Sequence, residues 1–297
     1  MKKYCVLIGI IIMFFSLTGI ALATDDEETT EDRFIIIKGD WFFAYQVNLS
    51  DRENAFKLKR GYLTVEKQFN DIFSARYTQD ITIDQEGDDA GNVELRFKYC
   101  YLKTELPDLG FFKHSYVQVG LVPRPLIDFE ASINDYLLQG KMYLDRMNII
   151  SSADFGLTAV TLLGGKMDEN YLSKVSSSFP GKYGSIAIGI YNGGGYNSLE
   201  YNNNKTIEGR FTLRPLSAIF PGLQFSYNMA IGHGNDTLQT PFRVHSFFLS
   251  HETRYTTFTA QYYLGTGNQN GYSWNSNRGY SFFGELCVPK LPITLFG

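Results

Sequence analysis

Cysteine, tryptophan and histidine are scarce in this chain, and an excess of basic charge is missing. The 297 residues include three cysteines, two tryptophans and four histidines. Cys5 lies in an apolar N-terminal stretch, so the body of the chain keeps Cys100 and Cys287, too few for a disulfide framework. The 27 basic side chains face 31 acidic ones, which excludes a nucleic-acid binder with a strongly basic surface.

Long apolar runs are absent beyond the first 23 residues, which excludes a transmembrane helix in the rest of the sequence. Those first residues have the pattern of an export signal: Lys2–Lys3 precede the apolar run Cys5–Phe15, and Ala21–Ala23 matches a small-x-small cleavage site. We therefore expect residues 1–23 to be a cleaved signal peptide, followed by an acidic segment at 24–33. An uncleaved membrane anchor is the alternative, because the apolar stretch is close to the length that spans a bilayer.

Tyrosine, phenylalanine and glycine are abundant instead, with 20, 24 and 28 residues respectively. This composition favours strands and turns over helices. Several segments alternate apolar and polar residues with a period of two, as a strand with two unlike faces does. In residues 93–101, for example, Leu95 and Phe97 fall on one side while Arg96 and Lys98 fall on the other. The same alternation is found in the stretches 72–84, 206–214, 223–232 and 257–264.

The polar sides of these segments carry full charges, which are tolerable inside a protein only where the interior is wet. Alternation alone is shared by a secreted sandwich, which buries its apolar face, and a membrane barrel, which turns that face to lipid. The export signal, the strand length of about ten residues and the many aromatic residues favour the barrel. We predict an all-β, antiparallel, up-and-down transmembrane β-barrel over residues 34–297, with a secreted sandwich as the alternative.

The connections between the segments support an up-and-down order. Long links alternate with short ones such as Asn70-Asp71, as external loops alternate with periplasmic turns in such barrels. The longest link is Pro123–Asp154. Gly165–Lys182 is also long, although it lies on the side where the other links are short. Counting the segments predicts twelve strands and the start of a thirteenth at Ile293–Phe296.

Five stretches resemble the phosphate-selective porin O/P family of Gram-negative outer membranes. They are "FKLKRGYLTVEKQFNDIFSARYTQDI", "VQVGLVPRPL", "YLDRMNIISSADFGLTAV", "IYNGGGYNSLEYNNNKTIEGRFTLRPL" and "RGYSFFGELCVPKLPITLFG". The resemblance implies an outer-membrane barrel of about sixteen strands that passes small anions such as phosphate. Family chains usually continue beyond the segment that "LPITLFG" resembles, so the resemblance also implies a chain truncated at its C-terminus.

The resemblance implies a constriction formed by a long loop folded into the lumen, where charged side chains select ions. Pro123–Asp154 is the candidate loop, and its Arg124, Arg146 and Lys141 are the candidate anion contacts. The polar faces of the strands supply the candidates on the wall of the barrel. These are Arg76, Arg96, Lys98, Arg210 and Arg214. The structural alternative is that the cations pair with Asp80, Glu94 and Glu208 and only keep the wet interior ordered.

The expected function is a non-enzymatic porin for passive diffusion of small hydrophilic solutes, without cofactor or metal. Its expected partners are small anions, outer-membrane lipid and lipopolysaccharide, the barrel assembly machinery and, as in related porins, two further copies in a homotrimer. No nucleic acid is expected. One alternative is a non-conducting structural or adhesive barrel that acts through its Asn- and Gly-rich loops. Another is a barrel hydrolase that uses His245 or His251 with Ser246 or Ser250, although no G-x-S-x-G or H-E-x-x-H motif is present.

Overall fold

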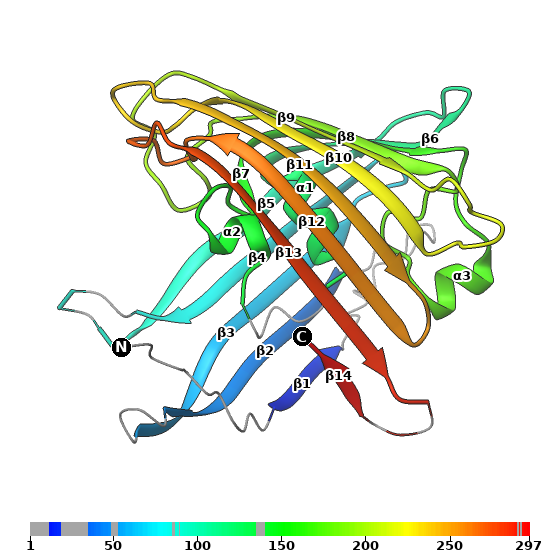
Figure 1. The fold of residues 1–297 in the computed structure, drawn as a ribbon, viewed down its shortest axis with the longest axis horizontal. Helices are drawn as coiled ribbons and strands as arrows, with labels where there is room; N and C mark the ends of the chain where they lie inside the picture. Colours follow the sequence, from blue (N-terminus) through cyan, green and yellow to red (C-terminus); the bar gives the residue numbers. More distant parts are fainter. Residues whose placement is uncertain are drawn as a thin grey trace, which may run out of the picture. The chain divides into compact units, whose positions relative to one another are not determined.

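The computed structural model describes residues 12–18, 35–48, 53–84, 87–88, 90–134, 140–289, 291 and 293–297. Its strands belong to one antiparallel sheet in which each strand pairs with the next along the chain (Figure 1). This confirms the predicted all-β, up-and-down class, and the strand order is that of a barrel. The strands are β1 (Ile12–Thr18), β2 (Ile35–Asn48), β3 (Glu53–Gln68), β4 (Phe73–Ile83), β5 (Val93–Glu105), β6 (Phe112–Pro123), β7 (Ala153–Leu163), β8 (Gly184–Tyr191), β9 (Thr206–Leu213), β10 (Leu223–His233), β11 (Pro241–Glu252), β12 (Thr256–Thr266), β13 (Ser276–Cys287) and β14 (Thr294–Phe296).

The strand count agrees with the sequence pattern. Within the predicted barrel region, twelve strands run from β2 to β13, and the short β14 follows where a thirteenth was expected to start. Ile12–Thr18 of the predicted signal peptide forms β1, which pairs with β2. The predicted cleavage site and the acidic segment at 24–33 lie outside the described residues.

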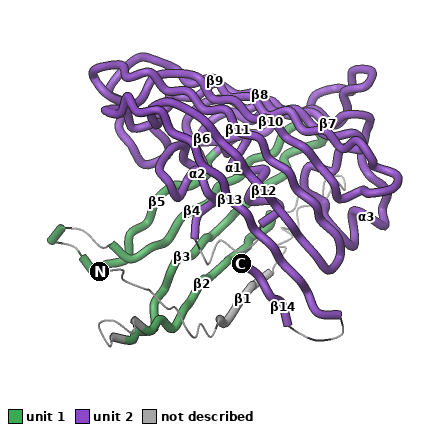
Figure 2. Tube along the Cα trace, in the orientation of Figure 1, with its two compact units in different colours: residues 1–100 green, residues 101–297 purple. Residues whose placement is uncertain are grey.

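The chain divides into two compact units, residues 1–100 and residues 101–297 (Figure 2). The first unit contains β1 to β4 and the beginning of β5, and the second contains the remaining strands and all three helices of the described residues. The helices are short: α1 (Pro125–Ala131), α2 (Tyr143–Arg146) and α3 (Glu169–Lys174). The sequence did not predict them, because helices of four to seven residues depend on packing and not on their own propensity.

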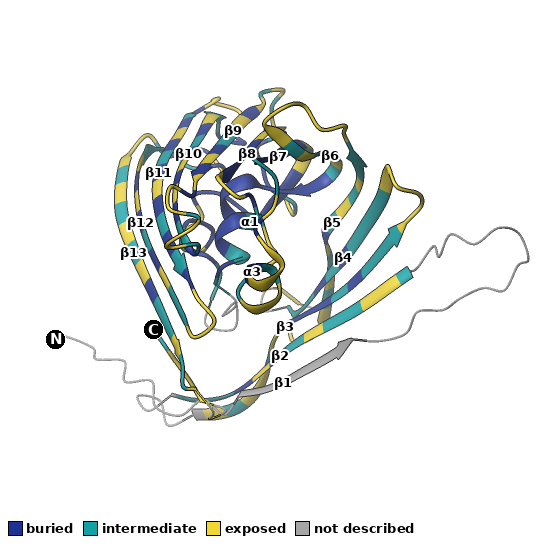
Figure 3. Ribbon diagram, turned by 90° about the vertical axis from the view of Figure 1, so that its right-hand side faces the viewer, coloured by how far each residue is buried: buried dark blue, intermediate teal, exposed yellow. Residues whose placement is uncertain are grey.

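The strands of the second unit bury their polar side and expose their apolar side (Figure 3). In β9, for example, Glu208 is 3% exposed whereas its neighbour Ile207 is 51% exposed. A sandwich would bury Ile207 and solvate Glu208. The polar side of each strand therefore faces the interior of the protein, and we call it the inward side; the apolar side is the outward side.

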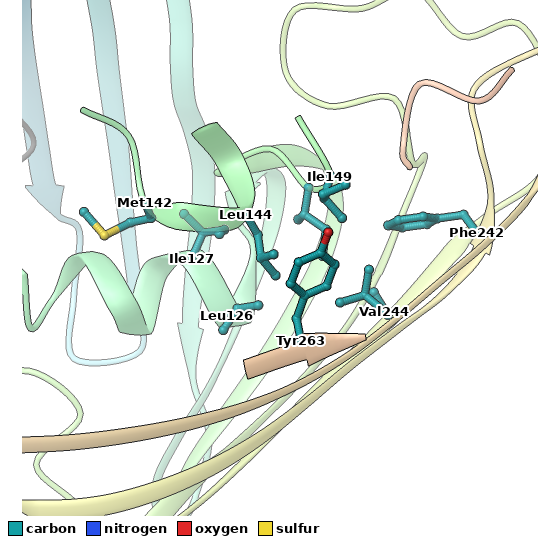
Figure 4. Close-up of a cluster of buried hydrophobic side chains, with 10 residues drawn as sticks. Leu126, Ile127, Met142, Leu144, Ile149, Phe242, Val244 and Tyr263 are labelled. Atoms are coloured by element: carbon teal, nitrogen blue, oxygen red, sulfur yellow. The ribbon is translucent and has the colours of Figure 1, made fainter. Parts of the chain in front are cut away.

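The inward side also holds the hydrophobic core of the second unit. Leu126 of α1 and Leu144 of α2 pack with Phe242 and Val244 of β11 and Tyr263 of β12 (Figure 4). The described parts of the long link between β6 and β7, residues 124–134 and 140–152, are thereby folded onto the inward side of the sheet, and we call them the inward link. Among the described residues, no helix has the length and apolar character needed to cross a membrane.

Candidate functional site

Arg124 holds the start of the inward link against β9 of the sheet. It stands between β6 and α1, where its backbone N–H donates to the Ser152 carbonyl at 3.1 Å. Its guanidinium is fully buried: Nε donates to Glu208 Oε1 at 2.7 Å, and Nη2 donates to the same oxygen. Nη1 donates to Gln269 Oε1 at 2.9 Å. Every one of these partners is a protein atom, so Arg124 has no surface left for a passing anion.

Asp154 and Tyr191 complete the surroundings of Arg124. Asp154 Oδ2 lies 3.9 Å from Arg124 Nη1 and accepts the backbone N–H of Gly193 at 2.8 Å. The Tyr191 ring lies 5.5 Å from the guanidinium carbon, and its hydroxyl shares a hydrogen bond of 2.7 Å with Thr158. Because a buried cation without partners is costly, this set of contacts holds the charge of Arg124 in place. The structural alternative in the sequence analysis included Glu208 among the carboxylates that pair with the cations, but it did not name Arg124 as its partner.

Gln269 ties the link between β12 and β13 to the inward link. Its side-chain oxygen accepts the Ser151 N–H at 2.5 Å as well as Arg124, and its own N–H donates to the Ile149 carbonyl at 3.1 Å. A neighbouring carboxylate, Asp236, accepts from Thr240 Oγ1 and from the N–H of Tyr272 at 2.6 Å. Burial alone would raise the pKa of Asp236, but these hydrogen bonds outweigh it and lower the pKa. The links β6–β7, β10–β11 and β12–β13, which lie at the same end of the strands, are therefore joined by polar contacts.

Arg210 lies where two links meet on the inward side. Its guanidinium carbon is 4.3 Å from the Phe129 ring of α1 and 4.5 Å from the Phe179 ring, which belongs to the link between β7 and β8. Nη1 donates to Ser185 at 2.8 Å and to Thr212 at 2.6 Å. The two rings also contact each other, with centroids 5.4 Å apart. Arg210 thus joins links that come from opposite ends of the sheet.

Arg214 fastens the second of these links. Its Nε donates to the Gly181 carbonyl at 3.2 Å, and its Nη1 donates to the Tyr171 hydroxyl of α3 at 2.9 Å and to the Pro221 carbonyl. Like Arg124 and Arg210, it is buried. These three predicted pore cations therefore lie on the inward side, where links cover them. Arg124 pairs with Glu208 as the structural alternative expects, whereas Arg210 and Arg214 contact uncharged groups.

The first unit carries a charged inward surface that is partly open. Asp80 is buried between Arg60 and Arg96, whose nitrogens lie 3.3 and 3.4 Å from its oxygens. Glu66 likewise bridges Lys38 at 3.1 Å and Arg76 at 3.6 Å. The Arg76 and Arg96 side chains nevertheless keep 36% and 24% of their surface exposed. We call Lys38, Arg60, Glu66, Arg76, Asp80, Glu94, Arg96 and Lys98 the charged wall.

Lys98 is the most enclosed cation of the charged wall. Its Nζ donates to the Tyr62 hydroxyl at 3.2 Å and lies 4.9 Å from the centre of the Tyr62 ring. Arg96 has a further partner, Glu94, at 3.8 Å. Sequence reasoning missed Arg60, because β3 contains a bulge. The register shifts between Phe42 and Phe43 of β2, whose partners are Arg60 and Leu58, and this shift interrupts the alternation.

The remaining candidates lie at α2. Arg146 is exposed, and the half-exposed Lys141 pairs with Asp145 at 3.4 Å. Beside them Glu130 is buried and accepts the Tyr143 N–H at 3.5 Å. Burial raises the pKa of Glu130 to about 7, while the nearby Arg146 acts in the opposite direction. Of the predicted loop cations, Lys141 and Arg146 are the ones that remain open to solute.

The histidines of the hydrolase alternative do not meet the serines. Ser246 and Ser250 are buried on the inward side of β11, whereas His245 and His251 occupy the alternate positions on the outward side. The His245 ring instead shares a hydrogen bond of 2.7 Å with the Tyr227 hydroxyl. A nucleophile and its base need direct hydrogen-bond contact, which opposite faces of one strand do not allow. In the described part of the chain, no three His, Cys, Asp or Glu side chains gather as metal ligands would.

The comparisons with known proteins add no relative. No protein-family model and no curated protein matches this chain. The inverted burial, the charged wall and the folded links are therefore the features that bear on function.

Proposed function

We propose that the protein is an outer-membrane porin, a β-barrel channel for passive diffusion of small hydrophilic solutes, with preference for anions such as phosphate. The observation that supports this proposal most is the inverted burial of the strands. Exposed apolar side chains, such as Phe211, Phe225, Phe247 and Phe258, recur on successive strands of the second unit. A soluble monomer rarely exposes so large a continuous apolar surface, whereas lipid requires one.

A wet interior is supported by polar groups on the inward side. Asn228 and Ser250 are buried there, and among the described residues no protein atom accepts from or donates to the Asn228 amide or the Ser250 hydroxyl. Buried polar groups normally have partners, and water supplies them where protein does not. Arg76 and Arg96 keep part of their surface exposed beside their carboxylate partners, so small anions in this water can reach them.

A second candidate function is a non-conducting structural barrel. The contact between Phe129 and Phe179 favours it, because links from both ends of the sheet meet there on the inward side of the second unit. The contacts of Asp236 and Gln269 also make the links at one end a joined surface on which a partner can dock. In that case the function would lie in the links and not in a pore.

Conductance across planar lipid bilayers separates the two candidates. The porin is expected to conduct, and Arg76→Gln with Arg96→Gln is expected to lower the ratio of anion to cation permeability roughly two- to fivefold, because two lumen charges are lost. The measurement is the reversal potential in a salt gradient. The control removes an exposed arginine of the short link after β11, Arg254→Gln, and should leave the ratio unchanged. Folded protein without conductance would support the structural barrel, and equal shifts in both variants would contradict the role of the charged wall.

The remaining expectations follow from the same proposal. We place the protein in the bacterial outer membrane, exported through its signal peptide and folded there by the barrel assembly machinery. Its neighbours would be outer-membrane lipid and lipopolysaccharide, and its assembly a homotrimer. The proposed activity is transport without chemical conversion of the solute.

A further inference from the structure

A groove of about 610 Å³ lies on the outward side of β11, β12 and β13. Arg243 of β11 and Arg278 of β13 line it and are exposed, and His245 of β11 lines it as well. Among the described residues that line the groove there is no carboxylate. Unlike the buried Arg124 on the inward side, these two arginines have no ion pair within the described residues. The groove is therefore a cationic site on the apolar side of the sheet.

The register of the strands brings these side chains together. Leu264 of β12 is the partner of His245 on one side and of Arg278 on the other, so the three form one row across the sheet. Arg243 pairs with Thr266 in the next row, toward the links. Adjacent strands are about 4.8 Å apart, so the backbones of the two arginines are roughly 10–12 Å apart. Two arginine side chains of ordinary length converge on one phosphate from that separation.

His245 is oriented toward the same groove by an aromatic neighbour. Its Nδ1 shares a hydrogen bond of 2.7 Å with the Tyr227 hydroxyl, and the two rings are stacked with an angle of 23°. This contact fixes the ring through Nδ1. The opposite nitrogen, Nε2, then serves as a third polar contact for an anion in the groove.

A second hollow, of about 520 Å³, lies beside the groove and is lined by aromatic side chains. Tyr262 lines both, so the cationic groove adjoins the apolar hollow. The main aromatic residues of the hollow are Phe225, Tyr227, Phe247, Tyr262, Tyr280 and Phe282. A cationic end joined to an apolar end is complementary to an amphiphile with an anionic head.

We infer that the groove and the hollow form a binding site for one phosphorylated lipid of the outer leaflet. Its phosphate is held by Arg243, Arg278 and His245, and its acyl chains lie against the aromatic hollow. This inference rests on the proposed membrane location. The groove lies at the end of the strands that carries the links 192–204 and 234–240, and long links face outward from the cell in such barrels. A second copy of the chain is less complementary, since the outward side here offers the arginines no carboxylate.

Lipid retention by the full chain tests the inference. The protein is purified in a neutral detergent, checked for folding by its heat-dependent shift on electrophoresis, and titrated with dioleoyl phosphatidic acid in native mass spectrometry. We expect Arg243→Gln with Arg278→Gln to weaken binding roughly tenfold or more, because two charged hydrogen-bonding groups are lost. Arg254→Gln, an exposed arginine in the short link after β11, is the matched control and should bind like the parent. Dioleoyl phosphatidylcholine should not distinguish the three proteins.

Two further arms identify the source of the anion. Dihexanoyl phosphatidic acid is expected to bind more weakly than the dioleoyl form, and inorganic phosphate should not displace the long-chain lipid. Equal binding by parent and double variant, or displacement by inorganic phosphate alone, would overturn the lipid site. So would a parent protein that stays oligomeric through this face and excludes lipid. Bilayer conductance of the same preparations separates the two proposals. If the parent binds phosphatidic acid more tightly than the double variant but does not conduct, only the porin is rejected. If it conducts but binds the lipid no better than the double variant, only the lipid site is rejected.

Discussion

Replacing Phe247 by arginine is expected to destabilise the protein in lipid vesicles, lowering its free energy of unfolding by about 2–4 kcal/mol, because the position lies near the middle of an outward strand surface. Phe247 is at the centre of β11 and is 52% exposed. In water an exposed phenylalanine is replaced by arginine at little cost. In hydrocarbon the guanidinium loses its hydration and finds no partner. Urea titration of folding into vesicles measures the difference.

Phe220 provides a closely matched control for this prediction. It is also 52% exposed, but it belongs to the link between β9 and β10. Phe220→Arg is therefore expected to change the free energy by less than about 1 kcal/mol, as substitutions near the membrane surface do. Exposed surface area alone would make the two variants equivalent. Equal effects of Phe220→Arg and Phe247→Arg would mean that β11 does not cross hydrocarbon.

Replacing Arg124 by alanine is expected to cost about 3–5 kcal/mol of unfolding free energy, because it leaves Glu208 buried without its cation. The contact between the two residues spans 84 positions of the chain and fastens the inward link to β9. Its loss should expose residues 125–152 to added protease before the strands unfold. Denaturant titration in detergent and timed proteolysis measure the two effects.

The double variant distinguishes a buried pair from simple packing. If the cost of Arg124→Ala comes from the uncompensated carboxylate, adding Glu208→Gln should recover part of it, giving a coupling energy of about 1–3 kcal/mol. Lys141→Ala is the matched control, because its pair with Asp145 is partly exposed and should be worth less than about 1 kcal/mol. Additive effects of Arg124→Ala and Glu208→Gln would contradict the pairing.

The strands could be predicted from the sequence because alternation with a period of two depends only on the strand itself having one polar and one apolar face, and not on which strands lie beside it. Residues 206–214 alternate without interruption and form a strand with the expected side inward. Residues 93–101 keep the expected side inward as far as Lys98, but Cys100 is exposed, so the alternation shifts by one residue there. The bulge beside Phe42 breaks the alternation in β3, so Arg60 was missed there. The local alternation of residues is therefore enough to predict the strands, but the prediction fails where the register shifts.

The candidate site was less accessible to sequence reasoning, because its contacts are long-range. Arg124, Arg210 and Arg214 were recognised as inward cations, but nothing in their own segments shows which links cover them. Phe179 meets Phe129 only because two links fold back onto the same strands. Their contacts depend on how the whole sheet presents its inward side, and that is fixed by strand pairing between distant parts of the chain.

A spin-label scan along β5 shows whether lipid contacts the outward side of the strands and water contacts the inward side. Single cysteines from Val93 to Lys98, with the native cysteines replaced by serine, carry the label in lipid vesicles. Labels at Val93, Leu95 and Phe97 should collide with oxygen dissolved in the bilayer, while labels at Glu94, Arg96 and Lys98 should collide with an aqueous nickel complex. The same accessibility at all six positions, or the opposite alternation, would contradict this arrangement of lipid and water.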